Sequence, residues 1–443
     1  MPDSIFMDAG ATTASKKEAR GAHPSIAPTP SPSRHGDPAQ RVTTGLVLTG
    51  GGARAAYQAG ALLGIRRVLI EAGWPADTNP FRVITGTSAG AINAASLAAG
   101  SHDFFGAVAS LSMVWGNFEP AQVYRVDPGG ALGNAARWLG ALGLGWLVHS
   151  QPRALFDTAP LRDLLLRMID FEQLQRNFEA GHLDSLAVAT SSYSSGHHVT
   201  FYQCATARKA WVRSQRIAHA TTLGVDHLMA SAAIPFLFPS IALPMANGAE
   251  YFGDGAMRQT APISPAVHLD SDRILVIGAA PLPVDRAGTS TGTTGDRAPH
   301  SPARALVGPP APASYPSLAQ IGGHALASIF FDSLSNDLER MTRINQTLSL
   351  LPPETREHSP LRALDTLVIC PSRPLDRLAA AHVDRLPRSV RALLRLVGVT
   401  KDSGSGIASY LLFDRSYTRR LIALGRRDAL AKRAEIVRFF RLD

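Results

Sequence analysis

Hydrophobic residues follow two alternating spacings along the first part of the chain. Gly45-Leu-Val-Leu-Thr49 is a short apolar run typical of a buried strand, and Ala53–Leu69 carries apolar residues at helical spacing. The pattern then repeats, with a strand predicted over Phe81–Thr85 and a helix over Ala91–Ala99. Further strands are predicted at Leu186–Thr190, Val199–Gln203, Ala210–Arg213, Ile274–Gly278 and Leu367–Cys370. This alternation predicts a three-layer α/β fold, in which helices cover both faces of a mainly parallel sheet.

Two segments have compositions that do not favour a packed core. Residues 1–40 and 285–316 are rich in Pro, Ser, Gly and Ala, and such segments bury too little apolar surface to offset the entropy of ordering. We expect a disordered N-terminal arm and a flexible loop there. We expect these segments to divide the chain into an α/β domain at 41–284 and a helical, basic C-terminal region at 317–443 that packs on it.

Charge and cysteine content bear on the partners of the protein and on its cellular compartment. The net charge of +9 lies entirely between Leu361 and Asp443, a stretch that holds 17 basic and 8 acidic residues. Such a region can meet nucleic acid or an anionic membrane, or it can be a solvated Arg-rich helical face. Cys204 and Cys370 are too few for a disulfide framework, and the N-terminus shows no recognisable secretory signal. We therefore expect a cytoplasmic protein.

A serine follows the second predicted strand in a glycine-rich turn. The strand leads into Gly86-Thr87-Ser88-Ala89-Gly90 and then into a helix, which is the G-x-S-x-G pattern in the strand-turn-helix context of a nucleophile elbow. Glycines at positions 86 and 90 allow the sharp turn that exposes the serine hydroxyl, and the start of the helix adds positive potential. Ser88 is thus the predicted nucleophile, with Gly86 and Gly90 as supporting residues.

The first strand ends in another glycine-rich turn, Gly50-Gly51-Gly52-Ala53-Arg54-Ala55. Its unpaired backbone N–H groups are suited to hold either the oxyanion of a tetrahedral intermediate or a phosphate. The turn also satisfies the G-x-G-x-x-A pattern of dinucleotide-binding folds, with Glu71 downstream. That pattern needs its acid at the end of the second strand, whereas Glu71 lies near a helix end. We therefore favour an oxyanion hole formed by Gly50, Gly51, Gly52 and Ala53.

A carboxylate that can serve the serine stands far downstream, in Tyr251-Phe252-Gly253-Asp254-Gly255-Ala256. A serine nucleophile needs a base, and a partly desolvated aspartate has a raised pKa that suits this role. An Asp-Gly pair taken alone is often only a turn. In combination with the elbow, Asp254 is the predicted base, with Gly255 and Ala256 as supporting residues.

These three motifs, in this order, resemble the signature motifs of the patatin-like phospholipases. The stretch Ala230–Pro239 is also similar to the helix and Pro-rich turn that this family places before its aspartate. The resemblance covers about residues 43–280. One departure is Ala55, where the family commonly has glycine, so that the loop carries an additional methyl group.

The resemblance implies a Ser-Asp dyad without histidine, an oxyanion hole from the glycine loop, and lipid acyl esters as substrates, as in a phospholipase A or a lysophospholipase. It implies no metal or organic cofactor. The alternative Ser-Asp-His triad would need a histidine after Asp254, and the candidates are His268, His324 and His382. None of the three has an informative sequence context, so we favour the dyad.

Several other polar residues allow two interpretations. Arg54 can support the glycine loop, contact a headgroup phosphate or form a structural salt bridge. Asn93 closely follows the elbow. His197 and His198 are better explained by polarity at a strand edge than by a metal site, because no third ligand stands nearby.

One apolar segment suggests where the protein acts. Residues 129–149 contain Trp138 and Trp146, one Arg and no acidic residue. Asn134, Arg137 and the glycines make this segment a poor transmembrane span, whereas its composition suits a lipid interface or a helix packed in the core. Together with the basic C-terminal region it predicts peripheral contact with the inner face of a membrane. We expect no nucleic-acid partner.

Overall fold

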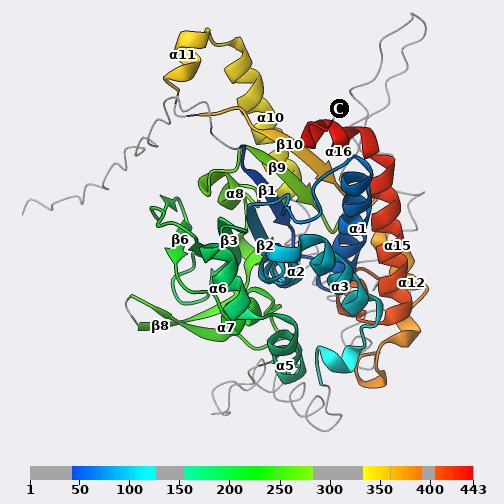
Figure 1. Cartoon of the computed structure of the whole chain (residues 1–443). Helices are drawn as coiled ribbons and strands as arrows, with labels where there is room; N and C mark the ends of the chain where they lie inside the picture. The colour runs from blue at the N-terminus through cyan, green and yellow to red at the C-terminus, as the bar shows by residue number, and fades with distance from the viewer. Residues whose placement is uncertain are drawn as a thin grey trace, which may run out of the picture.

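The computed structural model describes residues 42–125, 154–246, 248–282, 333–359, 361–391 and 405–442. The predicted N-terminal arm, the predicted flexible loop, residues 129–149 with Trp138 and Trp146, and His324 all lie outside these ranges. Within them, strands and helices alternate around a single sheet (Figure 1). No helix in the described ranges has both the length and the apolar character needed to cross a bilayer.

The sheet of the described residues has ten strands. They are β1 Thr44–Leu48, β2 Val83–Thr87, β3 Ser185–Ser192, β4 His198–Cys204, β5 Val212–Arg213, β6 Arg216–Ala220, β7 Ile241–Met245, β8 Gly248–Asp254, β9 Arg273–Ile277 and β10 Asp365–Ile369. The main order is β10-β9-β1-β2-β3-β4-β6-β5, and β8 pairs with both β3 and β7. The run from β10 to β3 is parallel throughout. Antiparallel pairing begins only where β4 and β8 join β3.

Helices cover both faces of this sheet (Figure 1). They are α1 Ala56–Glu71, α2 Ala89–Ala99, α3 Phe104–Gly116, α5 Ala159–Met168, α6 Phe171–Glu179, α7 Val225–Ser231, α8 Ser264–His268, α10 Ser333–Leu350, α11 Pro353–Glu357, α12 Leu375–Ala380, α14 Ser405–Leu411, α15 Arg415–Ala431 and α16 Arg433–Phe440. On one face, Leu46 and Leu48 pack with α1, α2, α3 and α15. On the other face, Val47 packs with residues of α8 and α10. Because successive strand residues point to opposite faces, this arrangement confirms the predicted three-layer α/β fold.

The C-terminal elements are built into the same structure as the first strands. Strand β10 extends the sheet beside β9, and α15 lies directly on α1. Glycines make this helix contact close, because a Cβ on Gly60 would lie 2.1 Å from the carbonyl oxygen of Ile422, and one on Gly425 would lie 2.1 Å from that of Tyr57. Residues beyond position 360 therefore pack against the helix that follows the glycine loop.

The predicted strands agree with the observed ones to within two residues, except at Ala210–Arg213, where only the last two residues pair. Three strands, β6, β7 and β8, were not predicted. Strand β6 is RIAHA, β7 contains Pro244, and β8 contains two glycines and is half exposed. Such strands lack the continuous apolar run that identifies a buried parallel strand.

Candidate active site

Ser88 occupies a strained turn between β2 and α2. Its φ of 56° lies in the left-handed region that residues other than glycine rarely adopt. The two flanking glycines let the strand and the helix come together, since a Cβ on Gly86 would lie 2.4 Å from the carbonyl oxygen of Gly90, and one on Gly90 would lie 2.3 Å from that of Leu48. Ser88 also caps the N-terminus of α2, where the helix dipole favours negative charge. The turn thus has the geometry of a nucleophile elbow. Ser88 is only 2% exposed, however, so the predicted exposure of its hydroxyl was wrong.

The register of the sheet brings Asp254 to this turn. Strand β2 pairs with β3 up to Thr87, which lies opposite Ala189. Strand β8 pairs with β3 from the next residue onward, so that Asp254 lies opposite Thr190. Since β4 occupies the other edge of β3, β2 and β8 share one edge and meet end to end. Two residues that are 166 positions apart in sequence are thereby placed side by side.

The two side chains form a short hydrogen bond in a buried setting. The Ser88 hydroxyl donates to Oδ2 of Asp254 at 2.6 Å, and the backbone N–H of Ala256 donates to Oδ1 at 2.9 Å. The Asp254 side chain is completely buried. Burial raises the pKa of this carboxyl to about 7, against the lowering effect of the two hydrogen bonds. A carboxylate with a pKa near neutrality is well suited to accept a proton from a serine.

Two neighbours hold the pair in place. The Ser231 hydroxyl accepts the backbone N–H of Ser88 at 2.9 Å and donates to the carbonyl oxygen of Ala189 at 2.6 Å. It therefore joins the elbow to the end of β3. At Gly255, a Cβ would lie 2.2 Å from the same carbonyl oxygen of Ala189, so only glycine allows the turn after Asp254 to approach β3 this closely.

The glycine loop lies directly beside the elbow. A Cβ on Gly50 would lie 3.2 Å from the Cβ of Ser88. Gly52 has a φ of +53°, a conformation that favours glycine. The backbone N–H groups of Gly50, Gly51 and Gly52 donate no hydrogen bond to any residue in the described ranges. These donors remain available for a ligand near Ser88, as an oxyanion hole requires.

The rest of the loop is a short 3₁₀ helix, Gly52–Ala55, that is buried throughout. Ala53 is the second residue of this helix, and Ala55 has φ −65° and ψ −12°, an ordinary right-handed helical conformation. The methyl group at position 55 therefore imposes no backbone strain on the loop.

A buried polar network connects the loop to the helix after the elbow. The Asn93 side-chain amide donates to Gln58 Oε1 at 2.9 Å and accepts the Trp115 indole N–H at 2.8 Å. The Gln58 amide in turn donates to the carbonyl oxygen of Thr49 at 2.8 Å. Asn93 thus acts as a structural connection between α2 and the start of the glycine loop.

A narrow apolar cavity of about 30 Å³ lies next to Ser88. Its walls come from α2, α3, α5, the turn after α7 and the segment after α14: Ile92, Trp115, Phe118, Leu161, Leu164, Leu165, Met168, Ile234, Phe238 and Phe413. The lining is almost entirely aliphatic and aromatic, so the space beside the serine is apolar.

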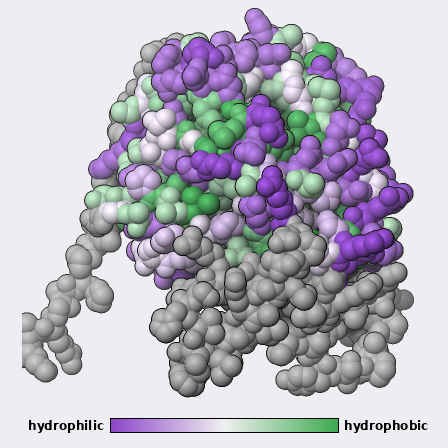
Figure 2. Space-filling view, turned by 90° about the horizontal axis from the view of Figure 1, so that it is seen from below, coloured by the Kyte–Doolittle hydropathy of each residue, from purple (hydrophilic) through white to green (hydrophobic). Residues whose placement is uncertain are grey.

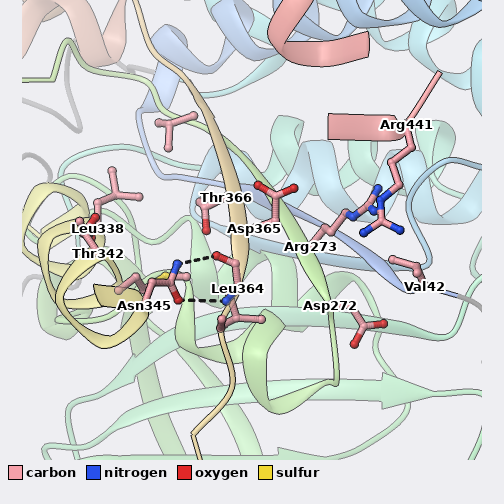
Figure 3. A pocket seen from close by; sticks show the side chains of 13 residues that line it. Val42, Asp272, Arg273, Leu338, Thr342, Asn345, Leu364, Asp365, Thr366 and Arg441 are labelled. Atoms are coloured by element: carbon pink, nitrogen blue, oxygen red, sulfur yellow. Dashed lines mark hydrogen bonds between the residues drawn. The ribbon is translucent and has the colours of Figure 1, made fainter. Parts of the chain in front are cut away.

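A wider groove of about 800 Å³ lies at the other edge of the sheet (Figure 3). It is lined by the starts of β9 and β10 and by α10, and Figure 3 shows Asn345 hydrogen-bonded to the backbone of Leu364 at its wall. Since the strands are parallel, the groove is at the opposite end from Ser88. Its lining by described residues contains no serine, cysteine or histidine.

The comparison with protein families agrees with this geometry. The family model for patatin-like phospholipases matches residues 46–267, about half of the chain, and this range includes the glycine loop, the elbow and Asp254. The chain belongs to the patatin-like phospholipase family. Patatin-like phospholipases are lipid acyl hydrolases, so the chain is an enzyme that acts on lipid esters.

Among solved structures, the chain is similar to VipD from Legionella pneumophila, with 13% sequence identity and a TM-score of 0.24. That similarity covers 86% of this chain and 67% of VipD. No curated protein matches the chain.

The two candidate histidines in the described part of this patatin-like chain have partners other than the Ser-Asp pair. His268 stacks on Trp211 with ring centroids 4.9 Å apart, and His382 contacts the Ser416 hydroxyl at 3.0 Å. Burial lowers the pKa of His268 to about 4. No histidine of the described ranges forms a hydrogen bond with Ser88 or Asp254.

His198 is the first residue of β4 and is buried, and His197 directly precedes this strand. In the described ranges, no group of three or more His, Cys, Asp or Glu side chains is arranged to hold a metal ion. The pair of histidines therefore has no third ligand there.

The structure shows the surroundings of two charged residues, Glu71 and Arg54. Glu71 ends α1, whose 16 residues span about 24 Å, and it pairs there with Arg67 and Arg433. It is therefore far from the glycine loop and cannot serve as the acid of a dinucleotide site. Arg54 is buried and forms an ion pair with Asp376, so the salt bridge considered for it is present.

Three residues near the patatin-like site were not identified from the sequence. Ser231 falls within the stretch that resembles the family, and a hydroxyl among small apolar residues there was an available signal. Asp376 and Phe413 belong to the C-terminal region, beyond the matched range. No sequence pattern connects them with the elbow, because their proximity arises only from the packing of α12 and α14.

Proposed function

We propose that this patatin-like enzyme hydrolyses acyl esters of phospholipids or lysophospholipids through an acyl-enzyme on Ser88, with Asp254 as the base. The observation that supports this most strongly is the 2.6 Å hydrogen bond between the Ser88 hydroxyl and the buried Asp254 carboxylate. It sets the nucleophile and the acceptor of its proton in direct contact, with no histidine between them.

The reaction follows from this contact in two stages. Ser88 Oγ attacks the ester carbonyl carbon while its proton passes to Asp254 Oδ2, and a tetrahedral oxyanion forms. The bond to the leaving alcohol then breaks, the alcohol takes the proton from Asp254, and an acyl ester remains on Ser88. In the second stage water attacks this ester, Asp254 accepts a proton from the water and returns it to Ser88, and the fatty acid leaves.

The glycine loop supplies the oxyanion hole in this proposal. Gly50 is in contact with Ser88, and the N–H groups of Gly50, Gly51 and Gly52 donate to no described residue. Each fixed donor aimed at the developing negative charge is worth about 3 kcal/mol of the barrier. Ala53, the second residue of the 3₁₀ helix, offers a fourth N–H group, which also donates to no described residue.

The apolar cavity beside Ser88 accepts the acyl chain in this proposal. Its aliphatic and aromatic lining suits a hydrocarbon, which would leave the ester group at the serine. With a volume of about 30 Å³ the cavity is too narrow for a long chain. The lining side chains must move apart as the chain enters.

We further propose that the enzyme meets its substrate at a membrane surface. Exposed apolar side chains are present at Leu166 of α5, Phe236 after α7 and Tyr251 of β8, each more than half exposed. These elements lie at the lower end of the molecule in Figure 1. Figure 2 views this end, and hydrophobic residues gather there between hydrophilic ones. Such a surface suits the lipid interface.

A lipid-class hydrolysis panel tests the proposed reaction. Purified full-length enzyme is incubated with a diacyl phospholipid, a lysophospholipid and a triacylglycerol, and released fatty acid is measured. Ser88→Ala should reduce release by on the order of 10³-fold or more. The matched control is Ser101→Ala, since Ser101 is also completely buried and its hydroxyl has no partner among the described residues.

Histidine variants separate the dyad from a triad. His268→Ala, His324→Ala and His382→Ala should each retain most of the wild-type rate. Full activity in Ser88→Ala would refute the proposed nucleophile. Loss of activity in one of the histidine variants, with Asp254→Asn near wild type, would establish a Ser-Asp-His triad instead.

A further inference from the structure

The C-terminal region lies directly on the glycine loop. A Cβ at Gly52 would lie 2.5 Å from the carbonyl oxygen of Tyr410 in α14. The loop and α14 are therefore in backbone contact, two residues away from Gly50 and its contact with Ser88. Because α14 follows the family-matched range by more than 100 residues, this contact is a feature of this chain outside the matched part.

A single buried side chain fastens the two segments together. Arg54 is 1% exposed. Its Nε donates to the Ser409 hydroxyl at 2.6 Å, and one terminal nitrogen donates to the carbonyl oxygen of Gly406 at 3.3 Å. The guanidinium carbon lies 4.2 Å from the centre of the Tyr410 ring. Three contacts with α14 therefore surround this cation.

The charge of Arg54 is balanced from a second C-terminal element. Asp376, in the first turn of α12, accepts a hydrogen bond from the same guanidinium and forms its ion pair. A buried cation that loses a carboxylate partner is strongly unfavourable and tends to move toward solvent. The position of the Arg54 side chain, and with it the backbone of its loop, thus depends on Asp376.

Arg54 belongs to the turn that lies beside Ser88 and whose first N–H groups donate to no described residue. Its backbone N–H donates to the carbonyl oxygen of Gly51 at 3.0 Å, so movement of Arg54 displaces Gly51 and its neighbours. Oxyanion donors act through being fixed in advance, and a displacement of about 1 Å can cost about 100-fold in rate. A support for this loop therefore acts on the chemical step.

We propose that Asp376 is a positioning residue of the active site, which holds the glycine loop beside Ser88 through Arg54. The C-terminal region then forms part of the catalytic framework of the enzyme. This inference rests on the proposed function, because it assigns a task to the loop of that same site.

Steady-state kinetics of full-length Asp376→Ala test the proposal with a soluble short-chain ester. We expect kcat to fall by about 10- to 100-fold with KM changed less than about 3-fold, since oxyanion donors act mainly in the transition state. The rate of covalent labelling by a fluorophosphonate should fall in parallel. Asp376→Glu, which restores a carboxylate, should recover much of the loss.

The matched control is Asp184→Ala. Asp184 also pairs with an arginine, Arg82, in a partly exposed setting, but it precedes β3 at the sheet edge opposite Ser88. It should leave kcat within about 2-fold of wild type, whatever its effect on thermal stability. Should Asp376→Ala fail to fold, Asp376→Asn takes its place and must show a loss that is confined to kcat.

Three outcomes would overturn the inference. These are a kcat near wild type in a folded Asp376 variant, a change confined to KM, and an equal loss in Asp184→Ala. Failure of the proposed function would appear differently, as activity that survives in Ser88→Ala while the Asp376 variants are also active.

Discussion

Asp254→Asn is the substitution for which the structure gives the most definite expectation. The carboxyl group is completely buried, one oxygen accepts from the Ser88 hydroxyl at 2.6 Å, and the other accepts from the Ala256 N–H at 2.9 Å. Asparagine preserves the shape of the side chain but cannot take the serine proton. Loss of a general base of this kind reduces the rate by about 10²- to 10⁴-fold.

The wild-type pH profile follows from the raised pKa of Asp254. Burial places this pKa at about 7, and only the ionised form can act as a base. The rate kcat/KM should therefore rise about tenfold per pH unit below pH 7 and level off above it, which leaves about 1% of the plateau at pH 5. Asp254→Asn should lack this acid limb along with most of the activity.

Stability should change with pH in the opposite sense. The folded-state pKa of about 7 exceeds the ordinary value of 3.8, so the folded protein holds this proton more tightly than the unfolded chain does. The stabilising contribution of protonated Asp254 is fully present below about pH 4 and is lost as the pH rises to about 7. A difference of about three units corresponds to up to about 4 kcal/mol. Asparagine carries no such dependence.

The assay combines rates from pH 5 to 9 with urea unfolding at pH 5 and pH 8. Relative to wild type, Asp254→Asn should gain stability between these two pH values. An acid limb near pH 4 in the wild type would refute the argument. So would a stability difference between Asp254→Asn and wild type that is the same at both pH values.

Three further predictions concern the surroundings of the site. Ser231→Ala leaves the Ser88 N–H and the Ala189 carbonyl without their hydroxyl partner, so it should lower the free energy of unfolding in urea by about 1–3 kcal/mol and should also lower kcat. An unchanged free energy of unfolding would contradict this expectation. Gly60→Ala places a methyl group against the Ile422 carbonyl of α15 and should lower the free energy of unfolding by about 1–3 kcal/mol. Gly224→Ala is the control, because nothing lies within 4 Å of the added methyl group, and it should change the free energy of unfolding little. Equal effects of the two substitutions would argue against the close helix contact. In liposome flotation, the full chain should bind anionic vesicles better than neutral ones and should lose that preference at high salt. The double variant Trp138→Ala/Trp146→Ala should float less than wild type. Membrane contact would be refuted if flotation depended neither on vesicle charge nor on salt and the double variant floated like wild type.

The central strands and the elbow could be predicted because their signals are local. Strands such as Gly45–Thr49 are buried on both faces and appear as continuous apolar runs, and the elbow appears as two glycines around a serine at fixed spacing. The positions of Ser88 and Asp254 follow from such short patterns. Their 2.6 Å contact does not, because it depends on the pairing of β2 and β8 along one edge of β3.

The elements that sequence analysis missed are those whose stability comes from tertiary packing. Strand β8 is half exposed and glycine-rich, and it is extended only because β3 and β7 flank it. The partner of Arg54 lies 322 residues away in the chain. The predicted alternatives for Arg54 could not be separated without knowing that α12 and α14 cover the glycine loop.

Covalent trapping of Ser88 tests the central claim most directly. Folded enzyme is treated with a fluorophosphonate at pH 8, digested and analysed by mass spectrometry, with Ser88→Ala and Asp254→Asn alongside. The account predicts a single phosphonyl adduct on the peptide that contains Ser88, no adduct in Ser88→Ala, and labelling of Asp254→Asn slowed by about 10²-fold or more. An adduct on another residue, labelling that persists in Ser88→Ala, or an Asp254→Asn enzyme that reacts at the wild-type rate would contradict it.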